Sequence, residues 1–104
     1  YHATPSALKE MMSSTPEQHK KGMEQWMIWA KKCGPGLVDI GNPLGFGIKL
    51  TKNESSPSKS TVVGYSILQA NNLEEAKNML KSHPHFNYAN GCDIEVHETM
   101  PMPK

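Results

Sequence analysis

The sequence predicts a small α+β domain, and three observations carry that prediction. Apolar residues recur at intervals of three and four in two stretches, residues 16–33 and 73–81, which is typical of amphipathic helices. Apolar residues alternate with others in the extended stretches, most clearly at 61–70 and 92–98. Turn residues punctuate the chain between them. The predicted order is helix, strand, strand, strand, helix, strand, in one domain covering residues 1–104.

The first long helix has the clearest start signal. Thr15 followed by Pro16 and Gln18 forms a capping box with proline at the first helical position. Gly34 and Pro35 end the helix. The apolar stripe expected to face the core is Met23, Trp26, Met27, Ala30 and Cys33. The preceding connector, residues 4–14, has helical spacing for one or two turns.

Short strands are predicted at 36–40 and 44–51, with the turn Gly41-Asn42-Pro43 between them. Residues 52–60 are rich in serine and predict a loop. Residues 61–70 have the strongest strand pattern in the sequence. One face of this strand is predicted to carry Val63, Tyr65, Ile67 and Gln69, and the other Val62, Gly64, Ser66 and Leu68.

Asn72 is predicted to cap the second helix, with Glu75 three residues later. Its apolar stripe is Leu73, Ala76, Met79 and Leu80. Residues 85–91 are predicted as a loop, 92–98 as the last strand and 100–103 as a non-helical tail. On the last strand, Cys92, Ile94 and Val96 suit the helix-covered face, so Asp93, Glu95 and His97 point to the opposite face.

A crossover helix needs a strand before it, and Tyr1-His2-Ala3 is all that stands in that place. With that strand restored, the pattern is βαββαβ, the ferredoxin-like order, whose first strand is largely missing from these residues. Two helices would cover one sheet face. The other face also carries apolar residues, and pairing it with a second copy would give a homodimeric α/β barrel.

Composition excludes several classes of function. Lys and Arg total 11 and Asp and Glu 10, so a formal charge of +1 gives no reason to expect nucleic acid or an acidic membrane as partner. No apolar run approaches the length of a membrane helix, and no signal peptide is visible. Cys33 and Cys92 make neither a disulfide framework nor a zinc site. We expect both thiols to be buried and inert in a reducing cytoplasm. We expect no metal and no cofactor.

Four stretches carry a family resemblance: GYSILQA at 64–70, LEEA at 73–76, HPH at 83–85 and GCDIEVHE at 91–98. With the region 26–43, they resemble the YCII-related proteins (YciI-like, DGPF-type) over most of the chain apart from 52–60. The resemblance implies a dimeric α/β barrel in which Tyr1-His2-Ala3 closes a first strand.

The resemblance also implies a class of chemistry, because a few relatives act on small cyclic or aromatic compounds with a proposed His–Asp dyad. The dyad histidine lies on the first helix of those relatives. Met23 or Glu24 holds that place here, so the dyad does not carry over. The Asp-Gly-Pro-Phe motif of another branch is absent, and Ser56-Pro57-Ser58 lies in its region.

Three positions on predicted strands are candidates for proton transfer. Glu95 and His97 are two apart on one strand, so they share a face about 7 Å apart and can form a general base; a polar pair on a strand surface is the alternative. His2 is expected closer to Cys92 and Asp93 than to His97, because first and last strands are antiparallel neighbours. A His/Asp pair at the sheet end and a turn histidine are the two alternatives there.

Four further residues are candidates for the site, but strand alternation alone does not determine their positions. Asp39 would point into the barrel if its neighbours Val38 and Ile40 pack under the helices, either hydrogen-bonded or functional. Trp29 either packs in the core or interface, or walls a pocket. His83 and His85 follow a helix end, where positive charge is favoured; metal binding is the alternative, without a convincing third ligand.

The leading functional hypothesis is a small-molecule site for isomerase- or lyase-type proton transfer, with His2, Asp39, Glu95 and His97 as catalytic groups and Trp29 as a wall. The competing hypothesis is a non-catalytic ligand-binding or protein-interaction module. An enzyme requires a histidine and a carboxylate to converge within hydrogen-bond reach in a concave site.

Overall fold

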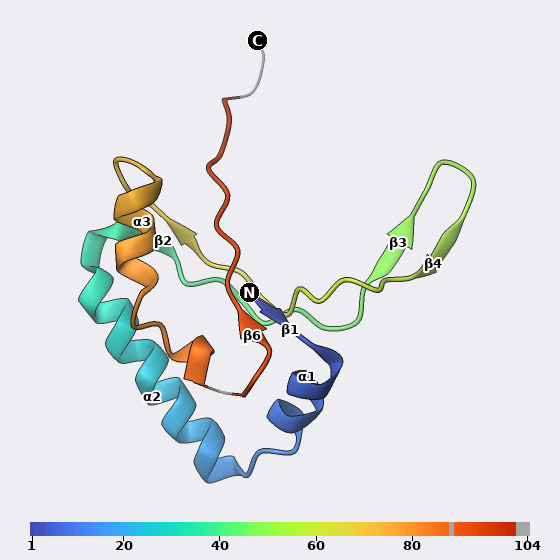
Figure 1. Cartoon of the computed structure of the whole chain (residues 1–104), viewed down its shortest axis with the longest axis horizontal. Helices are drawn as coiled ribbons and strands as arrows, with labels where there is room; N and C mark the ends of the chain where they lie inside the picture. Colours follow the sequence, from blue (N-terminus) through green and yellow to red (C-terminus); the bar gives the residue numbers. More distant parts are fainter. Residues whose placement is uncertain (88, 102–104) are drawn as a thin grey trace.

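A computed structural model describes residues 1–87 and 89–101 of the chain (Figure 1). The molecule is flat, with extents of 46 × 45 × 19 Å and a radius of gyration of 15.5 Å, against about 13 Å for a compact domain of this length. One hairpin projects from the body, and the segment after the last strand runs away from it (Figure 1). Much apolar surface therefore stays in contact with solvent.

The predicted helices are confirmed, with their caps. α1 (Pro5–Met12) begins at Thr4, whose Oγ1 accepts from the N–H of Ala7. α2 (Pro16–Cys33) has both hydrogen bonds of the Thr15–Gln18 capping box. Gly34, with φ +56°, ends α2 and begins the 3-10 helix η1 (Gly34–Gly36), because this left-handed region suits glycine.

The second predicted helix is α3 (Leu73–Leu80), which Asn72 caps through its Oδ1. It buries Ala76 and Leu80. The 3-10 helix η2 (Pro84–Asn87) follows. The residue at 88 and the end of the predicted tail at 102–103 lie outside the described residues.

The strands form three two-stranded antiparallel sheets, none of them closed, so the fold is mixed α+β. β1 (His2–Ala3) pairs with β6 (Cys92–Asp93), and His2 lies opposite Asp93, which confirms the predicted antiparallel pairing of the first and last strands. β2 (Leu37–Asp39) pairs with β5 (Ile67–Leu68). β3 (Ile48–Leu50) pairs with β4 (Ser55–Pro57) in the projecting hairpin. Isolated bridges join His2 to Val62 and Pro43 to Gly64.

Several predicted strand boundaries are wrong. The strand expected over 61–70 is reduced to β5 and the two bridges, and the one over 92–98 to β6. Both segments have β1 as a neighbour, and β1 contributes only two paired residues. Beyond those two residues the segments have no β1 backbone to pair with. The predicted loop 52–60 contains β4, because residues 55–57 pair with residues 48–50 of β3.

Two small buried clusters stabilise the fold. Ala3, Ala7 and Cys92 form the first, under α1. The second joins α2, α3 and η2, where Trp29 is 3% exposed and donates from Nε1 to the carbonyl oxygen of Met79 at 2.9 Å. The sequence placed the α2 stripe wrongly in part: Met23 and Met27 are exposed, because α2 turns Trp29 rather than these methionines toward η2 and α3.

No helix in residues 1–87 and 89–101 combines the length and the apolar character that a membrane crossing requires.

Candidate functional site

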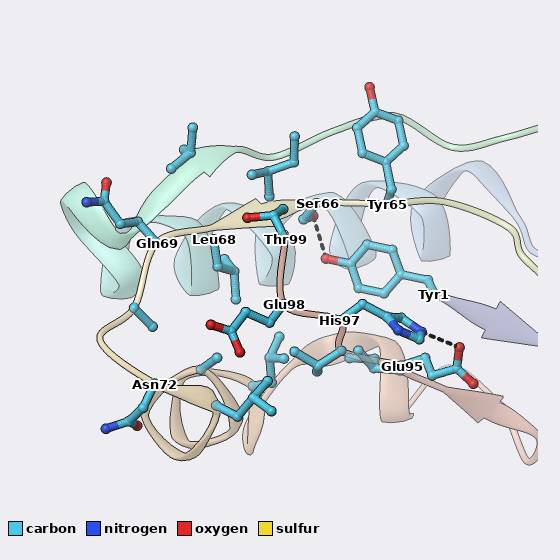
Figure 2. A pocket seen from close by; sticks show the side chains of 18 of the residues that line it. Tyr1, Tyr65, Ser66, Leu68, Gln69, Asn72, Glu95, His97, Glu98 and Thr99 are labelled. Carbon is cyan, nitrogen blue, oxygen red and sulfur yellow. Dashed lines mark hydrogen bonds and ion pairs between the residues drawn. The ribbon is translucent and has the colours of Figure 1, made fainter. Parts of the chain in front are cut away.

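Two histidines converge on one carboxylate oxygen near the paired end of β1 and β6. Nε2 of His97 lies 2.8 Å from Oε2 of Glu95 (Figure 2). Nε2 of His2 lies 3.6 Å from the same oxygen. The β1–β6 register brings His2 beside this carboxylate. Nδ1 of His2 is 2.6 Å from Oγ1 of Thr61, which fixes the ring. We call His2, Glu95 and His97 the carboxylate cluster.

The carboxylate cluster is accessible to water. The side chains of Glu95 and His97 are 64% and 78% exposed. The hydrogen bond from His97 lowers the pKa of Glu95, and the nearby charge of His2 lowers it further. The carboxylate is therefore ionised at neutral pH and can accept a hydrogen bond or stabilise a cationic imidazole.

A cavity of about 560 Å³ adjoins the cluster. One wall is formed by residues 65–72 and α3, the other by residues 94–99, and Tyr1 lies between them. Figure 2 shows Glu95 and His97 along one wall and Tyr65 and Ser66 along the other. Apolar side chains of α3 and β5 also line the cavity.

A directional chain of hydrogen bonds runs from η2 to the end of this cavity. Nδ1 of His83 accepts from the backbone N–H of His85 at 3.0 Å, so the neutral ring carries its proton on Nε2. That Nε2 lies 3.1 Å from the hydroxyl of Tyr1 and donates to it. Tyr1 then donates to Oγ of Ser66 at 2.5 Å, and Ser66 donates to the carbonyl of Ile40.

His83 and His85 correct one prediction. They were expected as positively charged groups at a helix end, but they are 0% and 2% exposed. Burial lowers the pKa of His83 to about 4, helped by the proximity of His85, and burial also lowers the pKa of His85. Both rings are thus neutral at pH 7. Nε2 of His85 lies 2.8 Å from the carbonyl of His2, so the ring anchors β1.

Asp39 does not join the cluster, and the condition under which it was expected to point into a barrel is not met. Its Oδ1 accepts from the N–H of Gly41 at 2.8 Å in an exposed turn. The premise fails because Val38 is exposed rather than packed under the helices.

Trp29 is a core residue, not a wall of the cavity beside Glu95. It contributes to the lining of a separate hollow of about 520 Å³, together with Gln25 and Pro84.

Of the two thiols expected to be buried, only that of Cys92 is fully so. Cys92 is buried and Cys33 is half-buried, and burial raises the pKa of both. Neither is a thiolate at neutral pH.

Sequence reasoning did not single out Tyr1, Ser66 and His83 as a connected group. The only signal was the pairing of first and last strands, which places Tyr1 between the two walls. Their hydrogen bonds join residues too far apart in the chain for any spacing rule to detect.

Across residues 1–87 and 89–101, no three His, Cys, Asp or Glu side chains gather in a way that could hold a metal ion. Comparisons with protein families, with curated proteins and with solved structures find no match for this chain.

Proposed function

We propose that this protein binds a small cyclic or aromatic organic compound at the carboxylate cluster and catalyses an isomerase- or lyase-type proton transfer on it. The convergence of His97 and His2 on Oε2 of Glu95 carries the proposal. An imidazole beside an ionised carboxylate is an arrangement that general acid–base catalysis uses repeatedly.

In the proposed reaction, His97 accepts a proton as a C–H bond of the compound breaks. Glu95 orients the ring and stabilises the positive charge that the proton brings. In an isomerisation, His97 returns the proton to another carbon of the same compound. In an elimination, His97 delivers it to the leaving group. Tyr65 and Ile67, both partly exposed, supply apolar contact for the ring of the ligand.

We also propose that a second copy of the chain covers the carboxylate cluster. Proton transfer benefits from the exclusion of water, which the open site of a single copy does not provide and a second copy over this face would. Val38, Tyr65 and Ile67 are exposed apolar side chains on β2 and the β5 segment, which supports pairing between two copies.

The strand neighbours support a ferredoxin-like arrangement. β6 lies beside β1, β1 is bridged to Val62 on the segment that continues into β5, and β5 lies beside β2, all antiparallel. A ferredoxin-like βαββαβ sheet has this neighbour order. The order, the resemblance to YCII-related proteins and the exposed face together favour a homodimeric α/β barrel.

The proposal is tested by binding and assembly. Ligand-detected NMR with a panel of small cyclic acids and phenols should identify binders that lose affinity at least tenfold in Glu95→Gln and His97→Gln. His19→Gln, an exposed histidine on α2, is the matched control and should bind unchanged. Equal binding by all four proteins would contradict the site. A monomer by light scattering at micromolar concentration would contradict the barrel.

A non-catalytic interaction module is the second candidate, and one observation favours it. The projecting hairpin presents Phe46, Ile48 and Leu50 to solvent at alternate positions, where they share one face. Two results together would favour this candidate over the enzyme. The protein would bind panel compounds without converting any of them, and replacing Phe46, Ile48 and Leu50 by serine would abolish the association of two copies.

A further inference from the structure

The hollow of about 520 Å³ beside α2 shares none of its described lining residues with the cavity next to the carboxylate cluster. It lies between α2 and the segment that leads from α3 into η2, and Figure 1 shows this segment running alongside α2. The α2 wall extends from Lys21 to Lys32, which is about 16.5 Å of helix. We call this hollow the α2 groove, and it has the length of a short extended peptide.

The α2 groove is basic at both ends. Lys21 and Lys32 lie on the same face of α2, because the spacing between them is close to three helical turns. Among the described residues, no Asp or Glu lines the groove. The ion pairs in the same part of the chain all involve Glu95, so no carboxylate there neutralises either ammonium group. The groove is therefore complementary to an anionic ligand.

Between the two lysines, the groove offers apolar and hydrogen-bonding contacts. Ile28 is 60% exposed and lines the groove together with Pro84. Gln25, Ser82 and Asn87 are exposed and line it with amide and hydroxyl groups, which can hydrogen-bond a peptide backbone. A small inorganic anion would leave these contacts unused, whereas an extended peptide uses the charged, apolar and polar groups together.

A second pair of lysines on α2 shows what distinguishes this one. Lys20 and Lys31 have the same spacing and are also exposed, but they do not line the α2 groove. Keeping a helix face solvated, or balancing the negative end of the helix, would explain either pair equally well. Lys21 and Lys32 alone have the groove, with its apolar and polar lining, between them.

We propose that the α2 groove binds an extended acidic peptide segment of a partner protein, with a carboxylate at each end and an apolar side chain between them. Side chains at positions 1, 3 and 5 of an extended chain share a face and span roughly 13 Å. The flexible side chains of Lys21 and Lys32 reach inward to the two carboxylates. The apolar side chain at position 3 then contacts Ile28. This proposal goes beyond the proposed catalysis and uses none of its residues.

The test measures binding of the end-capped peptide Asp-Ser-Leu-Ser-Asp to the full chain by NMR chemical-shift titration. We expect a dissociation constant of about 1 mM or tighter, with shifts at amides within 21–32 and 82–87. The double variant Lys21→Gln/Lys32→Gln should bind about tenfold more weakly, and Lys20→Gln/Lys31→Gln should bind almost unchanged. Both double variants remove two charges from the same helix, so the comparison separates position from net charge.

Two further comparisons test the apolar contact and the independence of the site. Ile28→Ser should weaken binding severalfold, whereas Met27→Ser should not, although Met27 is 57% exposed on the same helix. His97→Gln should bind the peptide like the unaltered protein. Failure of the proposed catalysis and failure of the α2 groove are therefore distinguishable.

Three results would overturn the proposal. One is the absence of shifts at 21–32 and 82–87 with several millimolar peptide. Another is equal weakening by the two double variants, which would show non-specific attraction to a basic helix. The third is equally tight binding of the neutral peptide Asn-Ser-Leu-Ser-Asn, which would show that the carboxylates are not recognised.

Discussion

The hydroxyl of Tyr1 and Nε2 of His83 lie 3.1 Å apart although 82 positions separate them in the sequence. The contact joins β1 to the turn that follows α3. His85 reinforces it, because its Nε2 lies 2.8 Å from the carbonyl of His2. Two buried, neutral imidazoles therefore hold the strand that places His2 beside Glu95.

This relationship predicts that the fold is weakened by mild acid. The pKa of His83 falls from 6.5 to about 4 on folding, so the unfolded chain binds protons in that interval while the folded chain does not. Stability from His83 is complete above pH 6.5 and is lost as the pH falls to about 4. The expected loss is roughly 3 kcal/mol, from ~1.4 kcal/mol for each pKa unit. Urea denaturation at pH 7, 5.5 and 4.5 measures it.

His83→Gln isolates that contribution. The variant should be less stable at pH 7 but should show a shallower loss between pH 6.5 and 4, because the buried proton acceptor is gone. His19→Gln should keep the wild-type slope, since His19 is exposed. An unchanged slope in His83→Gln would show that other groups cause the acid sensitivity.

Gly41 is predicted to be the least replaceable of the turn glycines. Its φ is +79°, and a Cβ there would lie 1.7 Å from the carbonyl oxygen of Tyr65. Gly34 also has a positive φ, of +56°, but its Cβ would meet nothing within 4 Å. We expect Gly41→Ala to lower the free energy of unfolding by at least about 3 kcal/mol and Gly34→Ala by about 1 kcal/mol. Equal losses in thermal denaturation would contradict the close approach.

Local signals in the sequence predicted the helices well and the sheet less well. Capping at Thr15 and Asn72 depends on residues three apart, so spacing alone reveals it. A strand depends on a neighbour that can lie anywhere in the chain. Residues 61–70 and 92–98 have strand patterns, yet only the parts beside paired neighbours form strands.

The candidate site was predicted to a similar extent. Glu95, His97 and His2 converge because alternation and antiparallel order determine their positions. Asp39 lies apart from them, because its side chain accepts a hydrogen bond from the N–H of Gly41 within its own turn. The burial of His83 depends on a cage of rings from Tyr1 and α2, which no pattern in the sequence encodes.

Trp29 is predicted to contribute to stability through a polar contact as well as packing. Its indole N–H donates to the carbonyl of Met79 and so joins α2 to α3. Trp29→Phe keeps an aromatic ring but leaves that part-buried carbonyl without its donor, at an expected cost of about 1–3 kcal/mol. Met27→Ala, on the exposed side of α2, should change the free energy of unfolding by less than about 0.5 kcal/mol. Urea denaturation compares the two, and a larger loss in Met27→Ala would contradict the orientation of α2.

The two histidines of the carboxylate cluster should contribute unequally to the pKa of Glu95. His97 lowers it most, through a hydrogen bond of 2.8 Å, and His2 lowers it less, chiefly through its charge at 3.6 Å. Carbon-detected NMR titration of the Glu95 carboxyl should therefore show a pKa that rises toward its ordinary value of 4.5 most in His97→Gln, less in His2→Gln and not at all in His19→Gln. If His2→Gln produced the larger rise, the main partner of the carboxylate would be β1 rather than its own segment, and the proton-accepting role would move to His2.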